Sequence, residues 1–134
     1  LLDKYMPIKL LKLKKFVNNN GTLIPIYLNK LKKFEIKRFF ILHGKKNSIR
    51  GDHAHKRCTQ IFIPLSGKIK LEVLKKNKKI FILGKMNQDM LIVPPLHWCK
   101  INFLEKKSSI LVLCDIKFSE KEYIRSYRKF LKYF

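Results

Sequence analysis

Short apolar runs that end at turn residues recur along this sequence, and they limit the folds it can adopt. Residues 59–65 are rich in β-branched and aromatic side chains and end at Ser66-Gly67, and residues 68–73 then alternate between charged and aliphatic side chains. Alternation with a period of two is typical of strands that bury one face. We therefore expect the two runs to pair as a β-hairpin within an all-β domain of short strands.

Further strand candidates extend this pattern toward both ends of the chain. Residues 108–115 are strongly apolar, residues 35–42 form a second candidate, and residues 22–27 form a third that contains Pro25. Proline has no N–H to donate to a β-ladder, so this third strand belongs at an edge or a bulge. Because edge strands can pair with another chain, we expect a homodimer that pairs or exchanges this N-terminal strand.

One α-helix is expected, near the C-terminal end of the sequence. Ser119 and Glu122 have the spacing of a capping box, in which Ser119 caps the first turn and Glu122 reaches back to it. The aromatic residues that follow recur at helical spacing and should form one buried face: Tyr123, Tyr127, Phe130 and Phe134.

Length and composition predict a single domain over residues 1–134, because 46% of the residues are hydrophobic. No apolar run approaches the roughly 20 residues that span a membrane, and residues 1–13 are interrupted by Asp3 and several lysines. We therefore expect no membrane span and a cytoplasmic protein. The cysteines occur without CxxC spacing, at Cys58, Cys99 and Cys114. Reduced thiols are the expectation for such a protein.

The charge of the chain is strongly positive. It has 31 basic and 9 acidic residues and a formal net charge of +22, and basic surfaces attract nucleic acids and other polyanions. The lysine pairs are spread along the whole sequence, however, and no helix-turn-helix, zinc-finger or RNP-like pattern accompanies them. We expect no specific nucleic-acid partner. A basic module that binds polyanions without catalysis stays as an alternative.

A site with two imidazoles is predicted near the middle of the chain. His53 and His55 stand two positions apart, and residues two apart in an extended segment project to the same face. Imidazole can take and give a proton near neutral pH because its unperturbed pKa is about 6.5. The pair therefore suits general acid/base catalysis. Arg38 and Arg50 flank it, and arginine offers a bidentate fork for phosphate oxygens.

Three ordered blocks within residues 21–130 resemble those of the sugar-nucleotide 3,4-ketoisomerases, which act on dTDP-4-keto-6-deoxyglucose. The blocks are Arg50-Gly51-x-His53-Ala54-His55-Lys56, Val93-Pro94-Pro95-x-x-Trp98 and Glu122-Tyr123-Ile124-Arg125-x-Tyr127. The H-x-H sequence, followed by Gln60 and a glycine turn, also resembles the first signature of the cupins. The resemblance implies a cupin-type jelly-roll barrel, which carries the predicted C-terminal α-helix.

The resemblance also implies an activity. A dTDP-linked 4-keto-6-deoxyhexose would be converted to its 3-keto isomer through an enediol, without a cofactor, in deoxyaminosugar biosynthesis for surface glycans such as lipopolysaccharide O-antigen. It assigns His55 as the carbon acid/base and His53 as the partner that moves protons among the oxygens, and it allows the two roles to be exchanged. The implied substrate-binding residues are Arg38, Arg50, Gln60, Trp98, Cys99, Asn20 and Phe40.

A metal site is the second class of chemistry to consider. In the metal-binding cupins two histidines and a glutamate are ligands, and His53 and His55 with Cys99 or His97 would suit zinc or iron. Gln60 stands in place of the glutamate, and a neutral amide is a poor ligand for a divalent ion. We therefore expect no metal, with a metal-dependent cupin enzyme as the alternative.

The chain differs from the family pattern at three positions, and two of them bear on which product is formed. Asn20 stands where relatives often have arginine or tyrosine, Cys99 where they often have histidine or arginine, and Phe40 where they have tyrosine. In the resembled family the positions of Asn20 and Cys99 are associated with the C4 configuration of the product. The resemblance therefore leaves that configuration open, as it does the nucleotide base.

Overall fold

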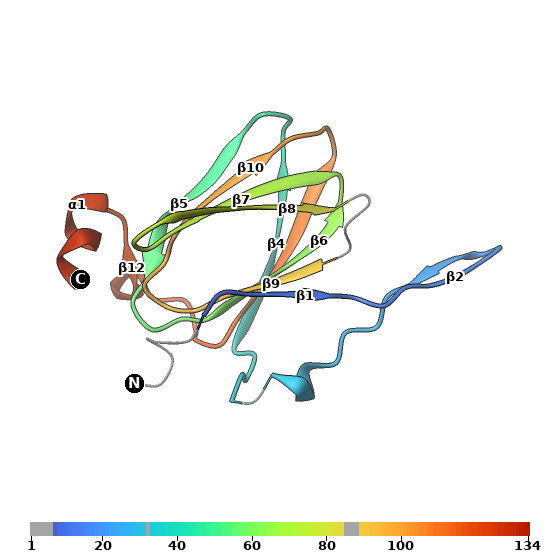
Figure 1. Ribbon diagram of the computed structural model, residues 1–134, viewed down its shortest axis with the longest axis horizontal. Coiled ribbons are helices and arrows are strands. Elements are labelled where there is room, and N and C mark those ends of the chain that lie inside the picture. Colours follow the sequence, from blue (N-terminus) through green and yellow to red (C-terminus); the bar gives the residue numbers. More distant parts are fainter. Residues whose placement is uncertain (1–6, 32, 85–88) are drawn as a thin grey trace.

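Two antiparallel five-stranded sheets pack face to face in a computed structural model that describes residues 7–31, 33–84 and 89–134 (Figure 1). In order across the first sheet the strands are β1 (Lys9–Lys12), β9 (Asp89–Val93), β6 (Gln60–Ser66), β11 (Ser108–Cys114) and β4 (Arg38–Gly44). In the second they are β12 (Tyr123–Ile124), β5 (Ile49–His55), β10 (Trp98–Phe103), β7 (Lys68–Leu74) and β8 (Lys78–Gly84). The predicted all-β class is confirmed.

The core lies between the two sheets, and the alternation of the strands explains it. In β7, Ile69, Leu71 and Val73 are fully buried, while the residues between them lie partly exposed on the outer face. Burying one apolar face of each sheet is the main source of stability for such a sandwich. The inward side chains of the opposite sheet, among them Phe62 and Val112, complete the same core.

The predicted hairpin of residues 59–73 is wrong in its pairing, although its turn is correct. β6 pairs with β9 and β11 in the first sheet, whereas β7 pairs with β8 and β10 in the second. Residues 60–64 of β6 are buried on both faces, and the strand has a neighbour on each edge. The chain crosses between sheets at Gly67, whose φ of +71° and close approach to the Ser108 backbone exclude a side chain there.

A separate hairpin projects from the body of the molecule near the N-terminal end (Figure 1). It consists of β2 (Phe16–Asn18) and β3 (Gly21–Leu23). The strand predicted over residues 22–27 therefore ends at Leu23, and Pro25 lies beyond the ladder, as its missing N–H requires. A short 3-10 helix follows at Leu28–Lys30.

The C-terminal helix begins later than predicted. A 3-10 turn at Glu120–Glu122 leads into β12, and the helix α1 spans Tyr127–Phe130, followed by a 3-10 turn at Leu131–Tyr133. Ser119 makes no capping hydrogen bond; Ser126 caps α1 instead.

The predicted capping box fails because the Glu122 carboxylate has other partners. It accepts hydrogen bonds from the backbone N–H groups of Arg57 and Cys58, and this contact holds the chain extended beside β5. Of the predicted buried aromatic face, only Phe130 is buried; Tyr127 and Phe130 pack against Trp98, and Phe134 packs against Phe130, but Tyr127 and Phe134 are exposed. Tyr123 lies in β12 and is not part of this aromatic group.

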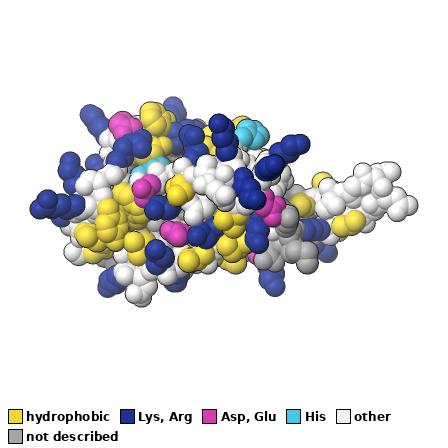
Figure 2. Space-filling view, turned by 90° about the horizontal axis from the view of Figure 1, so that it is seen from above, with side chains coloured by type: hydrophobic (Ala, Val, Ile, Leu, Met, Phe, Trp, Pro, Cys, Tyr) yellow, Lys and Arg dark blue, Asp and Glu magenta, His cyan; other side chains and the backbone are white. Residues whose placement is uncertain are grey.

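The surface charge is dispersed. Figure 2 shows lysines and arginines spread over the face in view, interleaved with apolar side chains, with no single basic stripe. Among the residues described, no helix has the length and apolar character to cross a bilayer.

Candidate active site

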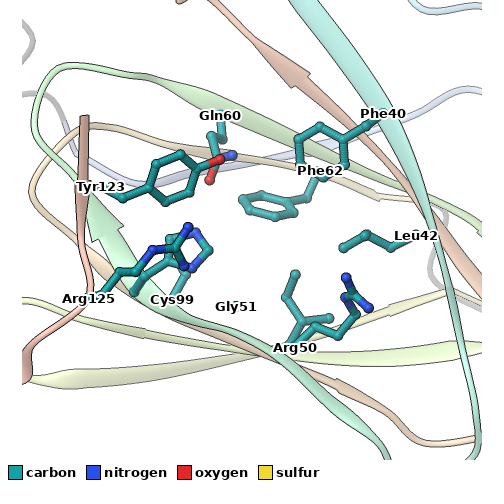
Figure 3. A pocket seen from close by; sticks show the side chains of 11 residues that line it. Phe40, Leu42, Arg50, Gly51, Gln60, Phe62, Cys99, Tyr123 and Arg125 are labelled. Carbon is teal, nitrogen blue, oxygen red and sulfur yellow. The ribbon is translucent and has the colours of Figure 1, made fainter. Parts of the chain in front are cut away.

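A cavity of about 270 Å³ opens between the two sheets (Figure 3). Its walls come from inward-facing residues of β4, β5, β6, β10 and β12. Residues predicted from the sequence line it as follows: His53, Arg50, Gln60, Cys99 and Phe40. Leu42, Phe62 and Ile101 add apolar surface, and Tyr123 and Arg125 close one side. A concave space with apolar walls and a few converging polar groups is the usual form of a small-molecule site.

A bulge in β5 sets the direction of His53. The pairing of β5 with β10 shifts register between Cys99 and Lys100, and Gly51 and Asp52 both have positive φ values, +83° and +62°. A Cβ on Gly51 would lie 3.0 Å from the Cys99 carbonyl oxygen, so this position requires glycine. The bulge leaves His53 opposite Cys99 with its ring at the cavity.

Trp98 supports this bulge from outside the cavity. Its indole Nε1–H donates to the Asp52 carboxylate at 2.9 Å. The ring packs with Ala54, Ile124 and Phe130 in a second apolar cluster beneath the C-terminal helix. The structure therefore places Trp98 away from the cavity, although the resemblance implied a contact with substrate.

The two histidines project to the same side of β5, which confirms the prediction from their spacing. Their ring centroids are 5.1 Å apart in an edge-to-face arrangement. Only His53 lines the cavity; His55 is 6% exposed. Tyr123 packs against both rings, with centroid distances of 4.8 Å to His53 and 4.4 Å to His55.

Both imidazoles are held neutral. Burial lowers the pKa of His53. Burial, together with the nearness of the His53 ring, which disfavours a second proton on the pair, and the positive charges of Arg38 and Arg125, lowers the pKa of His55 to about 3. Within the described part of the chain, His53 Nδ1 and both ring nitrogens of His55 have no hydrogen-bond partner. The neutral ring is the form that can act as a base, and the lowered pKa makes each imidazole a weaker base than a free one.

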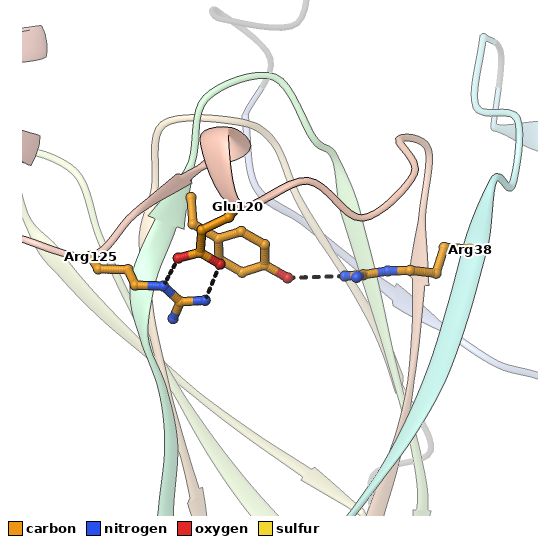
Figure 4. A network of polar contacts seen from close by, with 4 residues as sticks. Arg38, Glu120 and Arg125 are labelled. Carbon is orange, nitrogen blue, oxygen red and sulfur yellow. Dashed lines mark hydrogen bonds and ion pairs between the residues drawn. The ribbon is translucent and has the colours of Figure 1, made fainter.

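Arg38 is engaged with side chains of the protein. Its Nη2 donates to the Tyr123 hydroxyl at 3.1 Å (Figure 4). The same nitrogen lies 3.8 Å from Cys114 Sγ. Its guanidinium carbon sits over the rings of Phe40, at 4.9 Å, and Phe118, at 5.2 Å. These contacts place Arg38 beside the site, outside the cavity lining.

Arg50 and Arg125 both line the cavity but differ in their partners. No hydrogen bond or ion pair joins Arg50 to another side chain of the described residues, which leaves its guanidinium available for an anion. Arg125 makes a two-pronged ion pair with Glu120, at 2.5 and 3.0 Å, and stacks over the Tyr123 ring at 4.5 Å (Figure 4).

Two further predicted residues lie away from the cavity. Asn20 is exposed at the turn between β2 and β3, where its backbone N–H donates to Asn18. His97 does not share a face with Cys99, because Leu96 has a positive φ and β10 begins only at Trp98. The His97 Nδ1 contacts the carbonyl oxygens of Pro94 and Pro95.

The position of His97 removes one candidate ligand from the alternative metal site. His97 lines a separate hollow with Lys75 and Lys79 and cannot join His53 and His55. Over residues 7–31, 33–84 and 89–134, no three histidine, cysteine or acidic side chains converge as ligands.

Tyr123 and Arg125 are the residues that the sequence-based interpretation missed. Both fall in the third resembling block, so the signal was present. The aromatic spacing from Tyr123 to Phe134 favoured a helix, and this assigned Tyr123 to structural packing. Its place in β12, paired with His55, turns the phenol toward the histidines.

The chain matches one protein family over nearly its whole length. Residues 6–134 match the family model described as FdtA, WxcM-like, C-terminal. The chain is 31% identical over 133 residues to TDP-4-oxo-6-deoxy-α-D-glucose-3,4-oxoisomerase of Aneurinibacillus thermoaerophilus, covering 96% of this chain and 93% of that protein.

Solved structures of similar proteins show the same fold. A 3,4-ketoisomerase from Helicobacter canadensis has 30% identity and a TM-score of 0.86, covering 96% of this chain and 98% of that one. QdtA, a sugar 3,4-ketoisomerase from Thermoanaerobacterium thermosaccharolyticum solved with TDP, has 29% identity and a TM-score of 0.85, covering 94% and 93%. The cupin-type jelly roll implied by the resemblance is confirmed.

The neutral state of His55 predicts an acid-sensitive fold. Its pKa is about 3 in the folded protein and near 6.5 when unfolded, so only the unfolded chain binds a proton between these values. Stability should therefore fall as pH drops from 6.5 toward 3, by up to ~1.4 kcal/mol per pH unit from this residue. Urea unfolding at several pH values should show a shallower loss for His55→Asn.

The exposed His43 on β4 provides a matched control. His43→Asn should keep the pH dependence of the wild-type protein. An equal dependence in wild type and His55→Asn would contradict the buried neutral imidazole.

Proposed function

The chain belongs to the FdtA family, and on that basis we propose that it is a sugar-nucleotide 3,4-ketoisomerase. Its substrate would be a dTDP-linked 4-keto-6-deoxyhexose and its product the 3-keto isomer. One observation carries the proposal: a neutral imidazole, that of His53, faces a cavity with mixed polar and apolar walls between the sheets.

The reaction needs an acid/base and no external oxidant. A base removes the proton from C3, the C4 carbonyl becomes part of an enediol, and a proton returned to C4 leaves the carbonyl at C3. His53 is suited to both carbon steps because it is neutral and lines the cavity. The resemblance gave this role to His55, but His55 does not line the cavity. We therefore propose the exchanged assignment, with His55 as the neutral partner packed against His53.

The size of the cavity suggests how the substrate lies. About 270 Å³ is slightly below the ~300–1,000 Å³ of pockets that enclose drug-sized ligands. The hexose would enter, with Gln60, Cys99 and Phe40 as walls, and the nucleotide would extend toward solvent. Arg50 is the proposed diphosphate contact, because its guanidinium lies at the cavity without an ion-pair partner among the described residues.

A homodimer is part of the proposal. The β2–β3 hairpin stands clear of the body and exposes Phe16, Val17 and Leu23 by 50%, 72% and 65%. An isolated two-stranded hairpin is marginally stable in water, so a second copy is the natural cover for these side chains. Asn20 at its turn would then reach substrate only in the partner's site.

The cellular setting follows from the proposed substrate. We place the reaction in the cytoplasm, in deoxyaminosugar biosynthesis for surface glycans such as lipopolysaccharide O-antigen. The support is the similarity to enzymes named for TDP-sugar conversion.

The activity is tested by incubating the protein with TDP-4-keto-6-deoxyglucose in deuterated water. We expect a 3-keto product with deuterium at C4, and deuterium at C3 of recovered substrate. His53→Asn should lose about 10²–10⁴-fold in turnover, the usual share of a general acid/base, while His43→Asn should stay active. No product and no deuterium uptake would reject the function. Activity retained by His53→Asn but lost by His55→Asn would restore the assignment from the resemblance.

Metal dependence is tested separately. Because Gln60 replaces the glutamate ligand of the metal-binding cupins, chelator-treated protein should keep full activity. Elemental analysis should find no stoichiometric zinc or iron. About one metal ion per chain, with activity lost on its removal and regained on its return, would reverse this expectation.

The dimer is tested by sedimentation at micromolar concentration. The wild-type protein should sediment as a dimer, and Val17→Lys should dissociate it because a charge would replace an apolar contact. Ile80→Lys is the matched control, since Ile80 is also exposed but lies on β8, outside the hairpin. A monomeric wild type, or equal behaviour of the two variants, would refute the hairpin interface.

A further inference from the structure

The Tyr123 hydroxyl can donate a hydrogen bond for which no described side chain is the acceptor. Arg38 donates to its oxygen at 3.1 Å, and a guanidinium can only donate. The phenol must therefore point its own O–H elsewhere. No side chain of the described residues accepts this proton, and Tyr123 lines the cavity (Figure 3).

We propose that Tyr123 is a catalytic residue that carries the proton between the two sugar oxygens, and that Arg38 is the positioning residue that holds its phenol in place. This inference rests on the proposed function. As His53 takes the C3 proton, the C3–H electron pair forms the C3–C4 double bond and the carbonyl pair moves to O4. Tyr123 gives its proton to O4 and then takes the proton of the O3 hydroxyl. The proton on His53 goes to C4, so no atom or electron is gained or lost.

Charge around the phenol supports this role. The Arg38 guanidinium reaches its oxygen from one side, and the Arg125 guanidinium lies 4.5 Å from its ring centre. Two cations stabilise the negative charge that the phenol carries between its two proton transfers. Arg38 is itself fixed between the rings of Phe40 and Phe118 and by contact with Cys114.

Other groups are less suited to the oxygens. Of the described residues that line the cavity, only Tyr123 carries a hydroxyl. Burial raises the pKa of Cys99 to about 12, Gln60 has no acidic proton, and His55 lies outside the lining. The Phe40 ring faces Arg38 and offers no hydrogen bond.

The catalytic part is tested with Tyr123→Phe. We expect kcat to fall by about 10²-fold or more, as for loss of a positioned proton donor, with TDP affinity by calorimetry unchanged within about twofold. Tyr127→Phe is the matched control, because Tyr127 packs on Trp98 outside the cavity, and it should keep wild-type kcat. A Tyr123→Phe variant with kcat within threefold of wild type overturns the inference and leaves the function intact. A wild type without isomerase activity rejects both.

The positioning part is tested with Arg38→Met and Arg38→Lys. Arg38→Met should lower kcat and leave TDP affinity unchanged, and Arg38→Lys should recover part of kcat by restoring a cation. In the Tyr123→Phe background Arg38→Met should cost little more, because it acts through a hydroxyl that is already gone. Weaker TDP binding by Arg38→Met in both backgrounds would assign Arg38 to the diphosphate and overturn its positioning role. Arg128→Met, on the exposed side of α1, controls for loss of charge.

Discussion

The short pairing of β12 with β5 is the contact on which the site depends. It sets Tyr123 opposite His55 and Ile124 opposite Ala54. Glu122 secures it, because its backbone carbonyl accepts from Lys56 at 2.9 Å and its carboxylate accepts from the Cys58 N–H at 2.8 Å. A carboxylate that satisfies backbone donors makes strong hydrogen bonds. Without this clamp the phenol would lose its place beside both imidazoles.

The electrostatics of the site follow from the same packing. A chain of formal charge +22 places Arg38 and Arg125 near its two imidazoles, and their charges add to burial in lowering the pKa of His55. The site therefore keeps the imidazole bases neutral. The same cations lie around the Tyr123 phenol and, in our proposal, around the enediol. Cations that disfavour a protonated imidazole also favour an anionic intermediate, so both effects promote the same reaction.

The sequence predicted the features that depend on local periodicity. Alternation in β7 reports which side chains are buried, and the spacing of His53 and His55 reports a shared face. Side-chain chemistry indicated Arg50, and the resemblance added Gln60, Cys99 and Phe40; all four line the cavity.

Features that depend on distant partners were not predictable. The partner strands of β6 and β7 are not encoded in either run, so adjacent strands were taken for a hairpin. Glu122 has the spacing of a capping residue, but its carboxylate is used by the backbone of Arg57 and Cys58. Arg38 was assigned to phosphate because no local pattern reveals that Tyr123, far along the chain, occupies its guanidinium.

The central claim is that the sugar lies in the cavity with C3 against His53. The most direct measurement is a crystal structure of the His53→Asn variant with TDP-4-keto-6-deoxyglucose. We predict C3 within about 3–3.5 Å of the residue 53 side chain, the range of a near-attack geometry, and the sugar oxygens O3 and O4 at the Tyr123 hydroxyl. A sugar bound outside the cavity, or with C3 turned away from residue 53, would contradict the account.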